Sequence, residues 1–275
     1  MIENELNITS IKETLRDLPL GGILYFPVLP STNDFALNYE AKDTQDLILV
    51  ITNYQTNGRG RKDNKWISPE GSSLTFSLIL ALPEDMESNY GLYTAVGALA
   101  VINAIKNINN SIRPSIKWPN DILIQEKKVC GILVEASWVG EKIERIIIGI
   151  GINITKDAIP ELDRLSYTAT SLEVVHGQPV DRLALLHAIL KEIIHLRSQI
   201  GTQEFLSNWE DNLAFRGDLV EVWDDDNLVQ KGVLIGLAQD GALRLSGSNN
   251  NEVLVHFGEM HLRPSTNKSG GEESK

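Results

Sequence analysis

The sequence predicts an α+β protein in which a mixed β-sheet packs against helices and is followed by a small β-barrel. Strand-like and helix-like apolar patterns are mixed up to about residue 215, whereas short strands separated by Asp, Asn and Gly turns make up the remainder. The chain has 275 residues and is 42% hydrophobic, which is enough to fill the cores of a large and a small domain. We therefore expect domains at residues 1–215 and 216–265 and a polar, disordered tail at 266–275.

The first elements are expected to be a short helix and a strand. The segment ITSIKETLRDLP (8–19) is amphipathic and ends at Pro19, and GGILYFPVLP (21–30) has the pattern of a strand. Ser31 and Thr32 come directly before the helical segment NDFALNYEAK, so their hydroxyls are placed either to cap that helix or to face a ligand. Both interpretations remain open at this point.

Hydrophobic periodicity predicts the central elements. DLILVITNYQ (46–55) has the pattern of a buried strand, and SSLTFSLILAL (72–82) alternates like a strand with one covered face. LYTAVGALAVINAIKNI (92–108) repeats its apolar residues at helical spacing, which predicts a long helix against the sheet. Three strands, the last two joined by a hairpin turn at Gly140, and then two helices are expected at 115–125, 127–139, 144–155, 181–200 and 202–212.

The charge of the chain limits its partners. It carries 25 Lys+Arg against 37 Asp+Glu, a net charge of −12, so long-range attraction to nucleic acid or an anionic membrane is not expected. The apolar runs are shorter than the roughly 20 residues of a membrane helix, and the N-terminus lacks a basic-then-apolar leader, so we expect a cytoplasmic location. Cys130 is the single cysteine, which excludes an internal disulfide, and the five histidines lack metal-ligand spacing.

The loop between two of the predicted strands contains GRGR, residues 58–61. Its glycines let the backbone approach a ligand, and Arg59 and Arg61 carry guanidinium groups suited to phosphate or carboxylate oxygens. The segment lacks the GxxxxGK[ST] order of a P-loop. A solvated basic hairpin tip is the alternative interpretation, because such clusters are common on surfaces.

The motif KWPND brings Lys117, Asn120 and Asp121 to the mouth of a strand. A lysine, an amide and a carboxylate together are typical of a nucleotide and Mg²⁺ site, since burying both charges without partners would be costly. A structural turn held by Asn120 is the competing interpretation.

The segment KKVCGILVE places Lys128 just before a run that alternates into the core. Gly131 allows a group to pass close to the backbone there. We interpret Cys130 as a packed side chain because no basic partner is evident beside it.

The order of the motifs is more informative than any one of them. IGIGIN alone, with Gly149, Gly151 and Asn153, is weak evidence because the third glycine and following helix of a dinucleotide fingerprint are missing. However, STN, QxxGRGRxxxxWxSP, KWPND, KxxGILVE and GIN occur in this order between residues 23 and 155, and the combination resembles the biotin–protein ligases. QDGALRL and FGEMHLRP near the C-terminus resemble the small SH3-like domain of that family.

The resemblance implies an enzyme with a class II synthetase/biotin ligase-like catalytic domain. Such enzymes join biotin and ATP into biotinyl-5′-adenylate, release pyrophosphate, and transfer the biotinyl group to one lysine of a carrier protein. We therefore expect ATP, Mg²⁺ and biotin as ligands and no tightly bound metal. The expected partner is the biotin carboxyl carrier protein or domain of acetyl-CoA carboxylase, with no DNA and no membrane; a monomer and a homodimer both remain open.

The resemblance also implies roles for individual residues. The residues matched to the biotin pocket are Ser31, Thr32, Gln55, Arg59, Gly131 and Leu133. The residues matched to the nucleotide region are Arg61, Trp66, Lys117, Asn120, Asp121, Asn153, Glu259 and Arg263. Within that set, Trp66 is expected to pack near adenine, Asp121 to contact Mg²⁺, and Glu259 and Arg263 to close the small domain over the site.

Three residues are expected to act in catalysis. Lys128 matches the lysine that contacts the biotin carboxylate and the α-phosphate, where negative charge develops. Arg61 is expected to retain the adenylate beneath a closing loop, and Asp121 to orient or deprotonate the acceptor lysine.

Two departures from the family pattern qualify these expectations. The common run GRGRRGR here reads GRGRKDN, so closure is expected to be weaker or to use Lys62 or Lys65 instead. Only about twenty residues precede the first matching strand, so the DNA-binding domain of repressor-type members, and transcriptional repression, are not expected.

Two other functions compete with this one. A lipoate or octanoate transferase would share the catalytic fold, but Gln55 and the Ser31–Thr32 pair favour a ureido ring over a hydrocarbon chain. A non-catalytic binding protein would leave Lys128, Asp121 and Arg61 as mere surface charges.

Overall fold

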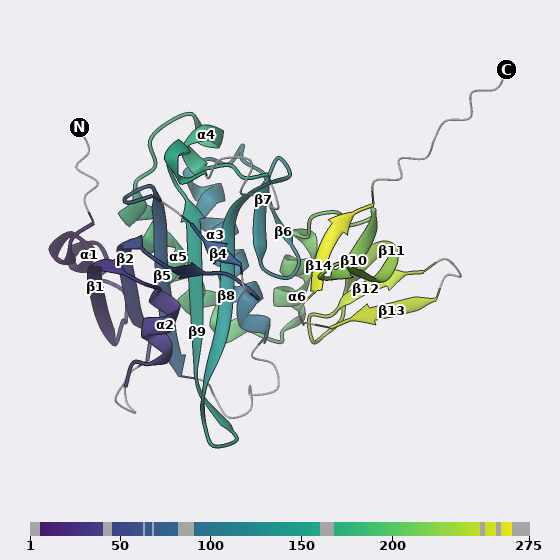
Figure 1. Ribbon diagram of the computed structural model, residues 1–275, viewed down its shortest axis with the longest axis horizontal. Coiled ribbons are helices and arrows are strands. Elements are labelled where there is room, and N and C mark those ends of the chain that lie inside the picture. The colour runs from purple at the N-terminus through teal and green to yellow at the C-terminus, as the bar shows by residue number, and fades with distance from the viewer. Residues whose placement is uncertain are drawn as a thin grey trace.

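Two β-sheets organise the computed structural model, which describes residues 6–40, 46–62, 64–67, 69–81, 91–159, 168–247, 251–256 and 260–265. A seven-stranded sheet with helices forms the large part, and a five-stranded antiparallel sheet forms the C-terminal part (Figure 1). The predicted α+β class, with a mixed sheet and a small C-terminal β-structure, is confirmed. Glu259 and the predicted tail at 266–275 lie outside the described residues.

The large sheet has the strand order β1-β2-β5-β9-β8-β7-β6. It is mixed because β1 and β2 pair in parallel, while the other neighbours pair antiparallel. Its strands are β1 (Gly22–Leu29), β2 (Ile48–Gln55), β5 (Ser73–Ala81), β6 (Pro114–Lys117), β7 (Asp121–Ile124), β8 (Lys127–Val139) and β9 (Lys142–Asn153). The predicted hairpin turn between β8 and β9 is confirmed, and Gly140 there has the left-handed φ of 64°.

The expectation that β5 has one covered face is wrong, because every residue from Ser73 to Leu80 is buried. β5 lies inside the sheet, and layers cover both of its faces: the main core with the helix that follows β5 on one side, and the helix that follows β1 on the other. One face carries aliphatic side chains such as Leu78 into the main core, and the other carries buried Thr75 and Ser77. The alternation therefore separates an aliphatic face from a polar face rather than an inside from an outside.

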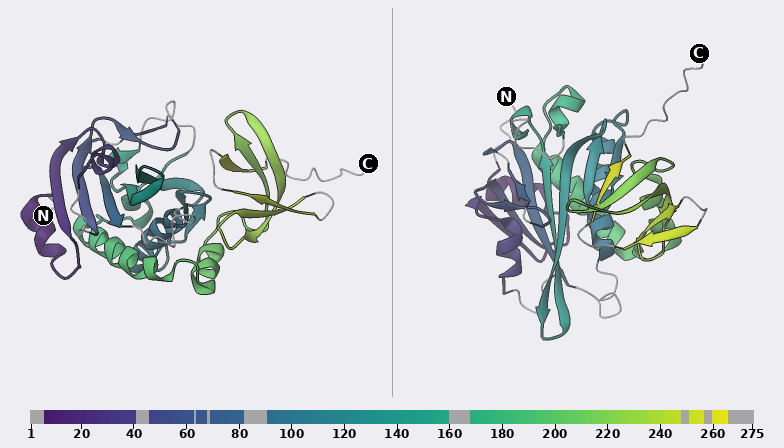
Figure 2. Two further views of the ribbon diagram at one scale, coloured as in Figure 1. Left: turned by 90° about the horizontal axis from the view of Figure 1, so that it is seen from below. Right: turned by 45° about the vertical axis from the view of Figure 1, so that its right-hand side comes forward.

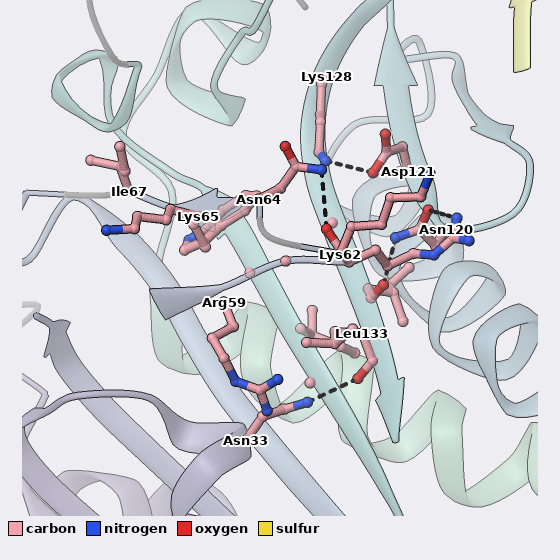
Figure 3. A pocket seen from close by; sticks show the side chains of 18 of the residues that line it. Asn33, Arg59, Lys62, Asn64, Lys65, Ile67, Asn120, Asp121, Lys128 and Leu133 are labelled. Atoms are coloured by element: carbon pink, nitrogen blue, oxygen red, sulfur yellow. Dashed lines mark hydrogen bonds and ion pairs between the residues drawn. The ribbon is translucent and has the colours of Figure 1, made fainter. Parts of the chain in front are cut away.

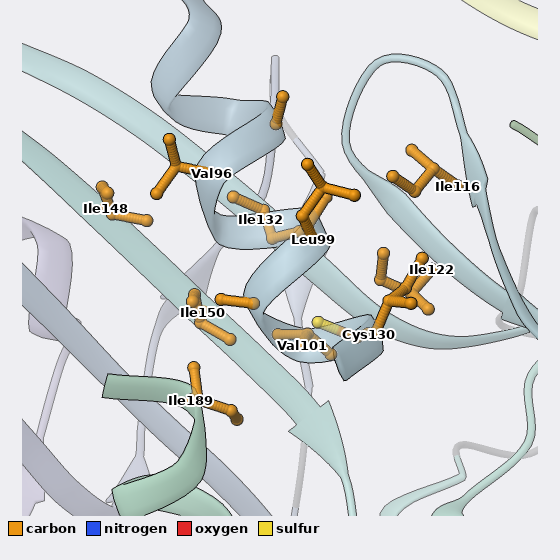
Figure 4. Packing of buried hydrophobic residues seen from close by; sticks show 14 of the residues in the cluster. Val96, Leu99, Val101, Ile116, Ile122, Cys130, Ile132, Ile148, Ile150 and Ile189 are labelled. Atoms are coloured by element: carbon orange, nitrogen blue, oxygen red, sulfur yellow. The ribbon is translucent and has the colours of Figure 1, made fainter. Parts of the chain in front are cut away.

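Helices α3 (Tyr93–Ile108) and α5 (Arg182–Leu196) pack against one face of the large sheet. In Figure 4, Val96 and Leu99 of α3 lie over Ile132 and Ile148 of the sheet, which confirms the predicted core helix. The remaining helices are α1 (Ile8–Thr14), α2 (Thr32–Leu37), α4 (Leu172–His176) and α6 (Gln203–Asp211), with 3₁₀ turns at Lys156–Ala158 and Arg197–Gln199. None of the helices in the described ranges is long and apolar enough to cross a membrane.

The segment 115–125 is not the single strand that its apolar pattern predicts. It is a hairpin of β6 and β7, in which Lys117 pairs with Asp121 and the Trp118–Pro119 bond is cis. Asn120 holds the turn to the neighbouring strand: its Nδ2 donates to the Ile132 carbonyl at 2.8 Å, and its own carbonyl accepts from Ile132 N at 2.9 Å. These bonds fix the chain reversal that periodicity alone does not reveal.

The C-terminal sheet has the order β13-β12-β11-β10-β14. Its strands are β10 (Leu219–Asp224), β11 (Asn227–Leu237), β12 (Leu243–Ser246), β13 (Glu252–Val255) and β14 (Met260–Pro264). It adjoins the β6 edge of the large sheet, next to α6 (Figures 1 and 2). Trp118 is buried at this junction and donates from Nε1 to the Gly241 carbonyl at 3.1 Å, and Leu237 N donates to Glu210 Oε2 at 2.9 Å.

Candidate active site

A short hairpin covers a cavity of about 880 Å³ above the large sheet (Figure 3). The hairpin consists of β3 (Gly58–Arg59) and β4 (Lys65–Trp66), and its turn is closed by a hydrogen bond of 2.7 Å from Gly60 N to the Asn64 carbonyl. The GRGR segment therefore forms the first strand and the start of the turn of a hairpin. Its arginines are not simply solvated, because both bond to side chains of the large part.

The cavity brings together residues from the hairpin, α2, the large sheet and the C-terminal sheet. Of the residues matched to the site by sequence, it is lined by Ser31, Thr32, Gln55, Arg59, Arg61, Trp66, Lys117, Asn120, Asp121, Lys128, Gly131, Leu133, Asn153 and Arg263. Glu259 is the one matched residue that the structure does not describe.

Glycines in the cavity floor make room for side chains. Gly131 and Gly151 pair across β8 and β9, and the Trp66 indole packs against both. A Cβ atom at Gly151 would lie 2.6 Å from Trp66 Cε2, and one at Gly149 would lie 2.0 Å from Asn33 Oδ1. The GxG pattern in this strand is thus explained by close packing against Trp66 and Asn33 rather than by a dinucleotide fingerprint.

One end of the cavity, which we call the Gln55 end, is formed by Ser31, Thr32 and Gln55. Thr32 donates to Gln55 Oε1 from its backbone N at 2.8 Å and from Oγ1 at 3.2 Å. Gln55 Nε2 faces the hairpin, since a Cβ atom at Gly58 would lie 2.8 Å from it. Because its oxygen is used internally, Gln55 offers its amide N–H groups to the cavity.

Ser31 is a helix cap, which is one of its two open interpretations, and it also lies in the cavity wall. Its Oγ accepts from Asp34 N at 3.2 Å at the start of α2. The helix cap therefore fixes the position of a side chain that a ligand would meet.

A buried hydrogen-bond network supports the Gln55 end from below. Ser77 Oγ lies 2.8 Å from Thr32 Oγ1 and 2.6 Å from Asn33 Oδ1. Asn33 Nδ2 donates to the Leu133 carbonyl at 3.2 Å and to Glu135 Oε2 at 2.8 Å. Because both contacts of Asn33 Nδ2 are to acceptors, the orientation of the Asn33 amide is defined. The network links α2, β5 and β8.

Arg59 extends this network into the hairpin. Its guanidinium donates to Glu135 Oε1 and Oε2 at 3.0 and 2.7 Å, and its Nε lies 2.6 Å from Asp34 Oδ1. Partial burial alone would lower the pKa of Arg59, but the hydrogen bonds and charges of Glu135 and Asp34 outweigh it and raise the pKa. Arg59 therefore fastens the first strand of the hairpin to α2 and β8.

The opposite end, which we call the charged end, is formed by Lys117, Asp121, Lys128 and Arg263. Lys128 Nζ lies 2.6 Å from Asp121 Oδ1 (Figure 3) and 5.9 Å from the centre of the Trp66 ring. Burial lowers the pKa of Lys117 to about 8; the charges of Lys128 and Arg263 lower it as well, against the opposing effect of Asp121. A concentration of positive charge with one carboxylate suits an anionic ligand.

Asn120 and Arg61 connect the hairpin to the charged end. Arg61 Nη1 donates to Asn120 Oδ1 at 3.3 Å, while Asn120 Nδ2 is used by the main chain of β8. The structural interpretation of Asn120 is therefore correct for its nitrogen, and its oxygen lies at the cavity.

Cys130 is fully buried, and burial raises the pKa of its thiol, which confirms the interpretation of a packed residue. Within the described residues, no three His, Cys, Asp or Glu side chains gather closely enough to hold a metal ion.

Sequence reasoning assigned no role to Asn33, Asp34, Ser77 or Glu135. Asn33 and Glu135 stood inside the motifs STN and KxxGILVE, so a signal existed for them. Ser77 and Asp34 had none, because a serine in a strand and an aspartate in a first helical turn are common.

Residues 25–153 match the model of the biotin/lipoate A/B protein ligase family. A bifunctional ligase/repressor of Escherichia coli is 30% identical over 245 residues, which cover 87% of this chain and 74% of that protein. A solved biotin protein ligase of Aquifex aeolicus, in complex with biotin and ATP, is 30% identical with a TM-score of 0.75 and covers 89% of this chain and 99% of its own.

A bifunctional ligase/repressor of Bacillus subtilis is 37% identical over 168 residues, or 61% of this chain. The chain spans about half the length of that relative, 51%. The similarity to that relative therefore covers only part of its length.

Proposed function

The chain belongs to the biotin protein ligase family, and from this premise we propose that it is an ATP-dependent biotin–protein ligase. In the first step a biotin carboxylate oxygen attacks the α-phosphorus of ATP, which forms biotinyl-5′-adenylate and releases pyrophosphate. In the second step a carrier lysine attacks the biotinyl carbonyl, and AMP leaves. One observation carries the proposal: a single cavity joins a neutral, hydrogen-bonding end to a charged end.

The Gln55 end fits the ureido ring of biotin. A urea is neutral and has one acceptor oxygen and two N–H donors, so it needs polar partners and no charge. Gln55 offers N–H groups, and Ser31 and Thr32 contribute hydroxyl oxygens in the same wall. Arg59, Gly131 and Leu133 complete this part of the proposed biotin site.

Lys128 is the proposed catalytic cation of the first step. Negative charge builds on the phosphoryl oxygens as the carboxylate attacks, and one well-placed cation contributes several kcal/mol there. Lys128 Nζ lies 2.6 Å from Asp121 Oδ1, and in the proposed reaction phosphate oxygens replace Asp121 as the partner of Lys128. The biotin carboxylate is ionised near neutral pH, so this step needs no general base.

The proposed nucleotide site consists of the charged end and its neighbours. Trp66 would pack against adenine; Lys117, Asn120, Asn153 and Arg263 line the same region. Glu259 is retained as a further proposed contact of the nucleotide. Arg61, bonded to Asn120, would hold the adenylate beneath the hairpin and so limit the access of water to the anhydride.

Mg²⁺ is proposed to bind together with the ATP phosphates. Mg²⁺ in such sites is held mainly by phosphate oxygens and one or two carboxylates. Asp121 is a carboxylate that lines the cavity beside Asn120 and Asn153, so the donor set fits this mode. When bound, the ion would neutralise charge on the leaving pyrophosphate.

The transfer step requires a deprotonated acceptor. A carrier lysine has an unperturbed pKa of about 10.4 and must lose a proton before it attacks. Asp121 is the proposed group that orients this lysine or accepts its proton. We propose that the carrier is the biotin carboxyl carrier protein or domain of acetyl-CoA carboxylase and that the reaction takes place in the cytoplasm.

The test is transfer of labelled biotin to a biotin carboxyl carrier domain in the presence of ATP and Mg²⁺. We expect incorporation by the wild type that excess lipoate does not reduce, and a loss of about 100-fold or more in Lys128→Ala. Lys127→Ala is the matched control, because Lys127 is an exposed lysine on the same strand outside the cavity. No incorporation by the wild type, or competition by lipoate, would contradict the proposal.

The same assay separates the two steps. When preformed biotinyl-adenylate is supplied, we expect Lys128→Ala to lose less activity in the transfer step than it loses in the adenylation step. Asp121→Asn is expected to be slow in this transfer reaction, and full transfer by Asp121→Asn would remove Asp121 from the second step.

A further inference from the structure

The tip of the β3–β4 hairpin contacts a turn of the C-terminal sheet. Lys62 Nζ lies 3.1 Å from Asp224 Oδ1 and 2.5 Å from Asp225 Oδ1, in the turn between β10 and β11. Asp224 and Asp225 follow Lys62 by 162 and 163 residues in the sequence. Both tips are sharply turned, since Lys62 and Asp225 have left-handed φ values of 54° and 50°.

Lys62 is directed toward the acids and not toward the cavity floor. Arg59 and Lys62 leave the hairpin on opposite sides (Figure 3), and the Lys62 side chain is 14% exposed. The hydrogen bond to Asp225 is the largest of several effects that raise the pKa of Lys62. Lys62, which replaces an arginine of the family run GRGRRGR, is therefore paired with carboxylates of the C-terminal sheet.

The acidic turn that contacts Lys62 is stabilised by this lysine. Asp224, Asp225 and Asp226 are consecutive, so their carboxylates repel one another, and a cation between two of them offsets that repulsion. Asp225 and Asp226 also line the cavity. The contact thus lies at the edge of the cavity between the hairpin and the C-terminal sheet.

We propose that Lys62, Asp224 and Asp225 form a latch that joins the hairpin to the C-terminal sheet and positions Arg61 over the reaction intermediate. The hairpin is then tied on both sides, by Arg59 to Asp34 and Glu135 and by Lys62 to the acidic turn. The acids of the latch are 50% and 72% exposed, so the latch is the weaker tie and opens first. This inference rests on the proposed function, because its consequence is slower release of biotinyl-adenylate.

A phosphate-binding role for Lys62 predicts different behaviour. If Lys62 bound ATP, its replacement would raise the KM for ATP, and reversing the charge of Asp225 would not compensate. The latch instead predicts that Lys62 and Asp225 variants share one phenotype and that exchanging their charges restores the wild-type behaviour.

The experiment compares Lys62→Glu, Asp225→Lys and the double variant. Each protein is loaded with labelled biotinyl-adenylate, and the rate of its release is measured after addition of excess unlabelled adenylate. We expect each single variant to release it about three to five times faster than wild type, which is the upper range for one partly exposed ion pair. The double variant should return to within about twofold of wild type.

Salt and a remote charge provide the controls. Raising ionic strength from 0.05 to 0.5 M should accelerate release from wild type more than from the uncharged Lys62→Gln variant, because both proteins keep the cations of the charged end but only wild type has the latch ion pair that screening weakens. Glu252→Lys, which reverses a charge paired with Arg244 elsewhere on the C-terminal sheet, should release adenylate at the wild-type rate. Additive effects in the double variant, or the same salt dependence in wild type and Lys62→Gln, would overturn the latch.

A second measurement separates failure of the latch from failure of the proposed function. Hydrogen exchange of the Gly60 and Asn64 amides, which close the hairpin turn, needs no ligand. Faster exchange in both single variants and protection restored in the double variant support the latch even in a protein that binds no adenylate. Equal exchange in all four proteins refutes it, whatever the enzyme activity.

Discussion

The two ends of the cavity are built from different interactions. At the Gln55 end, neutral side chains that are at most 9% exposed bond to one another within α2 and the large sheet. At the charged end, the Lys128–Asp121 pair of β8 and β7 is 29% and 19% exposed. Its neighbours Lys117 and Arg263 come from β6 and β14. The first end is thus fixed by the fold, whereas the second can exchange partners.

This difference has an energetic basis. A buried polar group that loses its partner costs about 1–3 kcal/mol, so a satisfied network keeps its geometry whether or not a ligand is present. Partly exposed ion pairs contribute about 0–1 kcal/mol, so phosphate oxygens can replace one partner at little cost. A rigid end suits selection of biotin, and an adjustable end suits a reaction in which phosphate charge arrives and leaves.

The largest effect should come from disturbing the rigid end. In Gly149→Ala the new Cβ atom would lie 2.0 Å from Asn33 Oδ1, which forces Asn33 out of the network. Overpacking of this kind costs about 1–3 kcal/mol, so we expect biotin affinity to fall by up to about 100-fold in calorimetric titration. ATP affinity should change much less.

Gly22→Ala is the matched control for that substitution, because its Cβ atom would make an ordinary contact of 3.5 Å with Ile48. An unchanged biotin affinity in Gly149→Ala would show that the Gln55 end is not rigid, and the comparison of the two ends would fail.

A smaller effect should distinguish the two acids that hold Arg59. Glu135→Gln removes an acceptor shared by Arg59 and Asn33 and is expected to lower biotin affinity about tenfold, as loss of a charge-assisted hydrogen bond does. Asp34 is 43% exposed and does not bond to the Asn33 side chain in the described network, so Asp34→Asn should cost about threefold or less. Equal losses in the two variants would show that only the charge of Arg59 matters.

The smallest effect concerns the pH dependence of the charged end. The proposed role of Lys117 is to attract phosphate in its protonated form, and its pKa is lowered from 10.5 to about 8, so this attraction would be present below pH 8 and lost as pH rises through 8. We expect kcat/KM for ATP to fall about threefold between pH 7.5 and 8.5, while biotin affinity stays constant. Lys117→Arg, which stays protonated, should abolish the fall; persistence of the fall in that variant would assign it to another group.

Local patterns in the sequence predicted much of this architecture. The N-cap at Ser31, the hairpin at Gly140 and the long core helix depend on residues within a few positions of one another, which is why they were predictable. The motif residues also meet in one cavity, as their resemblance to the motifs of a known family had led us to expect.

What escaped prediction depends on contacts between distant segments. Asn33 bonds to Glu135 across 102 residues, and Lys62 reaches Asp225 across 163, and no local pattern encodes either contact. The polar face of β5 was misjudged for the same reason, because Ser77 is buried only when α2 folds over it. The apolar pattern predicted one strand at the β6–β7 reversal and left a turn at Asn120 only as an alternative, because Asn120 is held by β8 rather than by its neighbours.

The junction between the two sheets has a consequence for sequence drift. Trp118 and Glu210 of the large part each bond to a main-chain group of the C-terminal sheet, the Gly241 carbonyl and Leu237 N. Every residue except proline carries the same main-chain N–H and C=O groups, so substitutions in the C-terminal sheet other than Leu237→Pro leave these two bonds intact as long as its backbone keeps its shape. The C-terminal sheet can therefore diverge faster than the cavity it adjoins and still remain docked in the same place.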